Sequence, residues 1–287
     1  MYYVLIMISV IMFGGCFALN DAYRKIRGSS LKTSLQFSFI GSLSSVIVLL
    51  IINGFKFEFT IFTLIMAVLA SISGFAFTYC SFKALGSINL SLYSLFSMLG
   101  GMVLPFFQGI FFYHETVTVA KLICFIMICV ALALTVKKDG NKGGTIYYIG
   151  VFVLNGMSGV LSKIFASAPF EKTSAAGYTM LISVCSVVIS AICLALFFGS
   201  VEDIVKPSIL SATIGSISGI TNKIANFVLV IALAHVDASV QYPMVTGGVI
   251  IVSTIICLFG KNKPSRNEIF SVLIAFIGLL AFFAIPI

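Results

Sequence analysis

The sequence is poor in charged residues and has no tryptophan. Only 9% of its 287 residues are Asp, Glu, Lys or Arg, whereas 60% are hydrophobic. An ordinary soluble domain is about a quarter charged, so this composition excludes one. The mean hydropathy of +1.17 instead predicts a polytopic membrane protein with the lipid bilayer as its surroundings.

Acidic residues and histidines are also scarce, which excludes several kinds of site. The nine acids and two histidines form neither a DDxxD nor an HExxH motif, so no metal-diphosphate or zinc-protease site is predicted. The seven cysteines fall within apolar segments without CxxC or zinc spacing. We expect them to behave as small hydrophobic residues, and we expect no metal and no cofactor.

Long apolar runs account for nearly the whole chain. Crossing about 30 Å of hydrocarbon takes roughly 20 helical residues, and ten such runs are separated by connections too short to hold a soluble domain. The predicted helices cover residues 2–19, 33–53, 60–82, 89–112, 119–136, 146–165, 174–198, 208–234, 239–259 and 269–286. The first run lacks the basic flank of a signal peptide, so we interpret it as an uncleaved span.

Lys and Arg are distributed unequally between alternate connections. Of the 17, 12 lie in the odd-numbered connections and four in the even-numbered ones. Because cytoplasmic loops carry this excess, the sequence predicts a multi-pass protein of the cytoplasmic (inner) membrane with both termini outside. The charges lie in short loops and form no basic face with interleaved aromatics, so no nucleic-acid partner is expected.

The two halves of the chain resemble each other weakly. The glycine pair at 100–101 aligns with the pair at 247–248, and VIMFGG at 10–15 aligns with VFVLNG at 151–156. Both glycine pairs are expected to allow helices to cross closely or to flex while the two halves rock against each other. The alignment predicts an internal duplication in which each repeat holds five helices.

Because each repeat has an odd number of helices, the two repeats must have opposite orientations in the membrane. The repeats cover residues 1–138 and 146–287 and are joined by a linker at 139–145. After five spans the second repeat enters the membrane upside down, as in secondary transporters whose substrate sites lie near mid-membrane between the repeats. We therefore expect an all-α membrane protein with ten transmembrane helices, arranged as two inverted five-helix repeats around a central cavity.

On these features the chain resembles the drug/metabolite transporter superfamily, specifically its ten-helix EamA-type branch. The resembling segments are Phe13–Gly15, Leu154–Gly156, Ala84–Leu85, Ala232–Leu233, Pro105, Pro243 and Glu115–Thr116. The resemblance implies a carrier that works by alternating access. The acid usual before the last helix is replaced by Lys261 or Asn262, so no relative's substrate is transferred to this chain.

A second departure concerns energy coupling. The related small multidrug resistance proteins rely on an intramembrane glutamate for proton antiport, and the first predicted helix here has none. The sequence therefore disfavours carboxylate-driven export of a cationic drug.

One predicted helix carries a charge in its apolar middle. Lys223 lies eleven residues before Ala234, about 16 Å along a helix, and a charge at that depth costs at least ~2.5 kcal/mol. Gly219, Asn222 and Asn226 share its face, and no acid lies at its depth. We interpret Lys223 as the cation that binds a negative group of the substrate, flanked by the two amides. A structural lysine that donates to backbone carbonyls, or is kept neutral by burial, is the alternative.

Other polar side chains are expected to face the same interior. The candidates for substrate binding are Tyr242, Gln241 and Thr246 in the ninth predicted helix, Tyr93 and Ser97 in the fourth, Asn155 in the sixth and Tyr79 in the third. Their hydroxyls and amides suit a polar ligand, although hydrogen bonding between helices is an alternative role. Lys83 and Lys163, near helix ends, are expected to reach the membrane surface.

Together these features predict a secondary transporter of a small polar metabolite, anionic or zwitterionic, and not an enzyme. One alternative is a flippase for a lipid-linked sugar or another amphiphile. An intramembrane enzyme that pairs a serine with Lys223 is the alternative from a different class. A monomer is expected, with a homodimer as the other possibility, and the partner is a small-molecule substrate.

Overall fold

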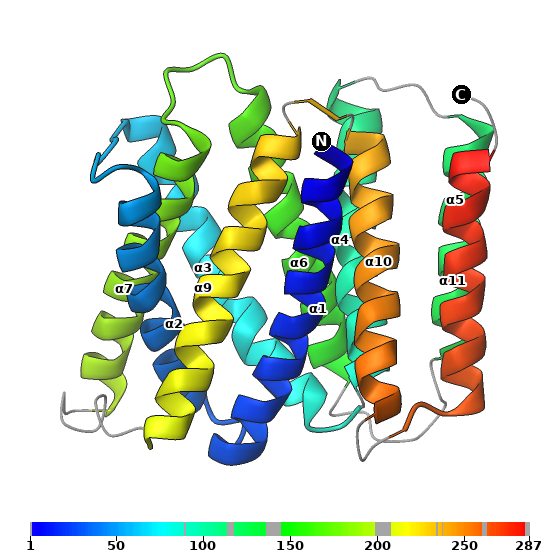
Figure 1. The fold of residues 1–287 in the computed structure, drawn as a ribbon, viewed down its shortest axis with the longest axis horizontal. Helices are drawn as coiled ribbons and strands as arrows, with labels where there is room; N and C mark the ends of the chain where they lie inside the picture. Colours follow the sequence, from blue (N-terminus) through cyan, green and yellow to red (C-terminus); the bar gives the residue numbers. More distant parts are fainter. Residues whose placement is uncertain are drawn as a thin grey trace.

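The computed structural model describes residues 2–88, 90–113, 118–135, 145–198, 208–233, 235–236, 238–259 and 263–284. Within these residues the chain forms ten α-helices and no strand (Figure 1). They are α1 (Tyr2–Arg27), α2 (Leu31–Ile52), α3 (Ile61–Leu85), α4 (Leu90–Tyr113), α5 (Val119–Thr135), α6 (Thr145–Ser167), α7 (Ala175–Phe198), α9 (Ile209–Leu233), α10 (Ala238–Phe259) and α11 (Arg266–Ala284).

Seven of these helices are long and apolar enough to cross a membrane: α1, α2, α3, α4, α6, α7 and α9. The outward faces of these seven helices carry large exposed apolar side chains, including Ile209 at 88%, Phe112 at 78% and Leu196 at 75% exposure. Soluble monomers rarely expose contiguous apolar patches above a few hundred Å². The protein is therefore a multi-pass α-helical membrane protein whose outer surface matches lipid.

Hydroxyl side chains mark where several helices begin. Ser30 accepts a hydrogen bond from the Thr33 amide at 3.1 Å at the start of α2, and Thr60 caps α3 in the same way. Ser174 accepts from the Gly177 amide at 3.1 Å at the start of α7. These caps satisfy backbone N–H groups that a helix leaves without partners.

The first helix is longer than the apolar run predicts. The polar segment after residue 19 was expected to be a connection, but α1 continues to Arg27. Asp21 pairs with Arg24 at 2.8 Å and with Lys25 at 2.6 Å, and such i, i+3 and i, i+4 pairs stabilise helix. A prediction from hydropathy alone does not take the stabilisation by these ion pairs into account.

The helices pack in a set of reciprocal pairs. α1 packs against α9 and α10, while α6 packs against α3 and α4. α2 contacts α7 and α9, and α7 contacts α2 and α3. α5 and α11 pair with each other at one edge of the molecule, away from α2 and α7 (Figure 1). The beginning of α1 and the end of α11 lie at the same end of the bundle.

Glycines bring two pairs of helices into backbone contact. A Cβ on Gly100 of α4 would overlap the backbone of Phe152 in α6, and a Cβ on Gly219 of α9 would overlap the backbone of Gly41 in α2. The close crossing expected at residues 100–101 is confirmed for Gly100. Small residues at such crossings are typical of membrane helices, which associate by close packing.

Lys163 does not reach the surface as the sequence suggested. Its side chain is buried, with 7% exposure, and its Nζ lies 4.8 Å from the centre of the Tyr113 ring. A cation over an aromatic face is stabilised by the ring quadrupole, so packing against α4 holds the lysine inside. The prediction for this residue was wrong.

Glu58 ties the connection between α2 and α3 to the start of α7. Its carboxylate accepts hydrogen bonds from the backbone amide and the hydroxyl of Ser174, at 2.6 and 2.8 Å. These two bonds hold the pKa of the Glu58 carboxyl below its ordinary value. A carboxylate beside a helix N-terminus is also favoured by the helix dipole.

Glu58→Gln is expected to lower the free energy of unfolding at pH 7 by about 1 kcal/mol or less, the size of a helix N-cap contribution. Because the pKa of Glu58 is lowered from 4.5, the stability that it adds is complete above that pH and is lost as the pH falls through the lowered pKa. The difference in melting temperature between wild type and variant should therefore close toward low pH. Glu171→Gln is the matched control, because Glu171 is exposed and has no hydrogen-bond partner within the described residues. An equal difference at every pH would contradict this role.

Candidate functional site

A cavity of about 290 Å³ lies inside the helix bundle. Eight helices line it, namely α1 to α4 together with α6, α7, α9 and α10, whereas α5 and α11 contribute no lining residue among those described. Binding pockets for small molecules start at about this size. The site is thus built by the first four helices of each half of the chain.

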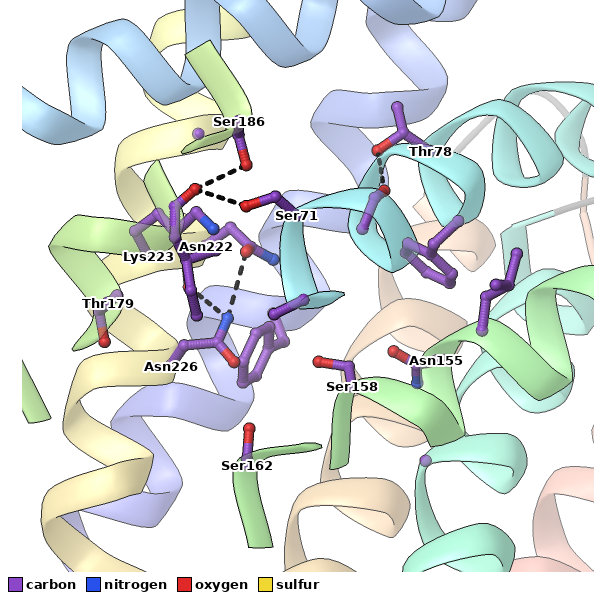
Figure 2. A pocket seen from close by; sticks show the side chains of 18 of the residues that line it. Ser71, Thr78, Asn155, Ser158, Ser162, Thr179, Ser186, Asn222, Lys223 and Asn226 are labelled. Carbon is purple, nitrogen blue, oxygen red and sulfur yellow. Dashed lines mark hydrogen bonds between the residues drawn. The ribbon is translucent and has the colours of Figure 1, made fainter. Parts of the chain in front are cut away.

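Lys223 lines this cavity from the middle of α9. Figure 2 shows it together with Asn222 and Asn226, which line the cavity from the same helix. The side chain is partly accessible from the cavity although it lies deep in the protein. Within the described residues it has no hydrogen bond, ion pair or ring contact.

The two asparagines beside Lys223 form one unit. The Asn226 Nδ2 donates to the backbone oxygen of Asn222 at 2.8 Å and to its Oδ1 at 3.2 Å. These bonds fix the Asn226 amide across one turn of α9 and keep it on the Lys223 side of the helix. The Asn226 Oδ1 and the Asn222 Nδ2 are left to bind a polar ligand.

Hydroxyl groups from two other helices complete this side of the cavity. Ser71 of α3 and Ser186 of α7 both donate to the backbone oxygen of Ile182, at 2.9 and 2.8 Å (Figure 2). Because a hydroxyl that donates still has lone pairs that accept, both serines can receive a hydrogen bond from a ligand or from an ammonium group.

Asn155 of α6 lines the cavity from another wall. Its Nδ2 donates to the backbone oxygen of Ser97 in α4 at 2.6 Å, which satisfies the amide that the sequence placed deep in the membrane. The side chain therefore both ties α6 to α4 and presents its Oδ1 to the cavity side.

Seven of the ten predicted binding residues line the cavity. They are Lys223, Asn222, Asn226, Asn155, Tyr242, Gln241 and Thr246. Three of these also bond to neighbouring helices: Gln241 to the Leu229 oxygen at 3.0 Å, Tyr242 to the Gly159 oxygen at 3.4 Å and Thr246 to the Met98 oxygen at 3.4 Å. Binding by these residues stays a prediction, but their placement together is a property of the fold.

The other three predicted residues lie away from the cavity lining. Tyr93 is fully buried and donates from its hydroxyl to Ser81 at 2.9 Å. Ser97 is also fully buried, and its backbone oxygen serves Asn155. The Tyr79 ring packs against Tyr147, with centroids 6.1 Å apart. All three side chains face neighbouring helices, because a helical position that carries a polar group can be used for packing as well as for a site.

Several lining residues were missed by the sequence reasoning. α2 contributes Ser38 and Ser42, and α7 contributes Thr179, Ser186 and Ser190. A signal was present, because these hydroxyls recur at helical spacings of three, four or seven residues. The same spacing is equally typical of helix packing, so hydroxyls alone did not indicate a cavity.

Two buried polar atoms of lining residues have no hydrogen-bond partner within the described residues: the hydroxyl of Tyr178 and the Oε1 of Gln241. Tyr178 stacks on Phe165 with ring centroids 3.9 Å apart. An unsatisfied buried polar group is costly, so both atoms would gain from a ligand or water that reached them.

The charge content of the site limits its chemistry. Among the described lining residues Lys223 is the sole charged side chain, and no group of three His, Cys, Asp or Glu in the searched residues could hold a metal ion. The arrangement can bind a ligand through one cation, amides and hydroxyls. Glu115–Thr116, one of the segments in which the sequence resembles the EamA-type transporters, lies outside the described residues.

Comparisons with known proteins give a fold and no family. No protein-family model matches the chain, and no curated protein matches it significantly. A solved structure described as "Crystal structure of protein" has a TM-score of 0.64, with 17% sequence identity over 98% of this chain and 96% of that one. At this identity the likeness concerns the fold alone, which the two chains share over nearly their whole lengths.

Proposed function

We propose that this protein is a secondary transporter that moves a small polar metabolite, anionic or zwitterionic, across the cytoplasmic membrane by alternating access. Ten transmembrane helices form two inverted repeats, residues 1–138 and 146–287, as in the EamA-type drug/metabolite transporters that the sequence resembles. One chain encloses the whole cavity, so a monomer is sufficient for transport. The observation that carries the proposal is that Lys223, which has no partner among the described residues, lies inside a cavity bounded by both halves of the chain.

The reciprocal helix contacts support the duplicated architecture. If α1, α2, α3, α4 and α5 are equivalent in this order to α6, α7, α9, α10 and α11, then exchanging the halves converts the α1–α9 contact into α6–α3 and the α1–α10 contact into α6–α4. The α2–α7, α4–α10 and α5–α11 contacts convert into themselves. α1 and α6 run in opposite directions in Figure 1, as an inverted repeat of five helices requires.

The distribution of charge supports the orientation. α1 has three basic residues in its last turn, α3 has Lys83 in its last turn, and α11 begins at Arg266. These helix ends lie at the end of the bundle opposite the termini (Figure 1). By the positive-inside rule we place them in the cytoplasm and both termini on the other side of the membrane.

Transport is tested by counterflow in proteoliposomes. Compounds that raise the melting temperature of the purified protein, and so bind its folded state, are loaded inside, and the labelled compound is added outside. We expect transient accumulation of label above equilibrium that protein-free liposomes do not show. Chemical conversion without movement would indicate an enzyme, and movement of a lipid-linked sugar in place of the soluble compound would indicate a flippase. Either result would contradict the proposal.

A further inference from the structure

The net charge of the ligand follows from the charges that surround it. The described lining contains one lysine, no arginine, no histidine and no carboxylate. A buried net charge is costly unless an opposite charge compensates it. A ligand with one negative charge makes the occupied site neutral when Lys223 is an ammonium, whereas a dianion leaves one negative charge in excess and a zwitterion leaves one positive charge.

An ammonium group on the ligand would find poor partners here. The acceptors available to it are neutral: the Asn155 and Asn226 amide oxygens, the serine and threonine hydroxyls and the backbone carbonyls. It would also share a small cavity with Lys223, and two like charges in a medium of low dielectric repel strongly. Among the lining residues that the structure describes there is thus no carboxylate to offset the desolvation of an amine.

The cavity also has a continuous apolar wall. This wall comprises Phe13, Phe17, Phe77, Met98 and Val245, all of which line the cavity. Phe17, Met98 and Val245 belong to the largest apolar cluster of the protein, and Phe13 and Phe77 pack against that cluster. The wall comes from α1, α3, α4 and α10, whereas Lys223 and its two asparagines come from α9.

An apolar wall opposes binding of a ligand that is polar all round. Each polar group placed against it loses hydrogen bonds to water without replacement, while an apolar group gains by leaving water. The volume of about 290 Å³ lies at the small end of the range of small-molecule pockets. The cavity thus suits a charged head at Lys223 joined to a compact apolar body.

We propose that the ligand of this cavity is a monovalent organic acid, a single carboxylate on a small apolar body, with the carboxylate at Lys223 and the body against the apolar wall. This inference rests on the transporter function proposed above and narrows its substrate from polar anions and zwitterions in general to apolar monocarboxylates. The carboxylate then accepts hydrogen bonds from the Lys223 ammonium and from the Asn222 Nδ2, the donor that the two asparagines leave unused.

The test uses four probes that share a phenyl group and differ in charge: 3-phenylpropionate, phenylalanine, phenylsuccinate and 3-phenylpropylamine. Each is titrated against the purified full chain by calorimetry and thermal shift and then offered in the counterflow assay. We expect 3-phenylpropionate to bind at least about tenfold more tightly than the other three, because a charge-assisted hydrogen bond contributes about this factor. Acetate, which has the head without the body, should bind more weakly still.

Two matched variants test whether the preference for 3-phenylpropionate arises in the cavity. Lys223→Met should remove the preference for 3-phenylpropionate, while Lys83→Met should keep it, because Lys83 lies outside the lining with its Nζ 5.8 Å from the Tyr79 ring centre. Equal or tighter binding of phenylalanine or phenylsuccinate, or binding of none of the probes, would overturn the inference. Counterflow of phenylalanine would overturn the ligand class but leave the transporter intact. Binding of 3-phenylpropionate without counterflow would overturn transport but leave the ligand class.

Discussion

Lys223→Met is expected to abolish transport and to leave the protein folded. Removing one partner of a buried charge pair typically costs about 2–5 kcal/mol of binding free energy, which is roughly thirtyfold or more in affinity. Methionine keeps the apolar stem of lysine and is only one heavy atom shorter. Because Lys223 has no partner within the described residues, its loss leaves no protein group unpaired, and removing an uncompensated buried charge does not destabilise the helix bundle.

The measurements that check this prediction are counterflow of the acid found to bind the wild type and the melting temperature of the ligand-free protein. Lys223→Arg is the charge-conserving control and should retain part of the affinity, since its planar group differs in shape from an ammonium. A melting temperature of Lys223→Met equal to or above that of the wild type would separate a binding role from a structural one. Unchanged affinity in Lys223→Met would refute the binding role.

Gly219→Ala is expected to destabilise the protein strongly, although alanine is the better helix former. In an unconstrained helix this change gains about 1 kcal/mol. At Gly219 the new methyl group would overlap the backbone of Gly41. Backbone atoms, unlike a flexible side chain, cannot relieve the overlap by changing rotamer. Overpacking of this kind costs typically about 1–3 kcal/mol and occasionally more, so α2 and α9 must separate.

The matched control is Gly74→Ala in α3. Gly74 also lines the cavity from the middle of a helix, but a Cβ there would meet no atom within 4 Å. We expect this variant to melt at or above the wild-type temperature, whereas Gly219→Ala melts several degrees lower in the same detergent. If both variants melted alike, close contact between α2 and α9 would not contribute to stability. Since Gly219 lies one turn from Lys223, Gly219→Ala should also weaken ligand binding.

Much of the fold could be read from the apolar runs. Each predicted run falls on a helix of the structure within the described residues, because a backbone in hydrocarbon must satisfy its own hydrogen bonds. The ends were less predictable. Hydropathy placed the end of the first helix near residue 19, whereas ion pairs of Asp21 extend α1 to Arg27. Such local pairs stabilise polar helix that a hydropathy pattern interprets as a loop.

Residues of the candidate site could be predicted where burying their polar groups costs much free energy. Lys223 and Asn155 stood out because a charge or an amide in the apolar middle of a helix needs a polar environment. Tyr93 lies outside the cavity lining, and its hydroxyl donates to Ser81 in α3. Ser186 was overlooked for the opposite reason. A hydroxyl costs little to bury when it donates to its own helix, as Ser186 does to the Ile182 oxygen. A serine in an apolar helix therefore neither indicates a binding site nor argues against one.

The sequence by itself determined that the chain is a multi-pass helical membrane protein and that Lys223 must face away from lipid, because both conclusions follow from the cost of placing polar groups in hydrocarbon. Only the tertiary structure decided which helix faces pack against each other. The backbone contact between Gly41 and Gly219 and the eight helices around the cavity come from packing between segments far apart in the chain. A side chain's position along one helix sets its depth, but the neighbouring helices decide whether it faces a partner or a cavity. That is why the depth of Lys223 and the absence of an acid at that depth could be predicted from the sequence, whereas the helices that surround Lys223 and the apolar wall of the cavity could not.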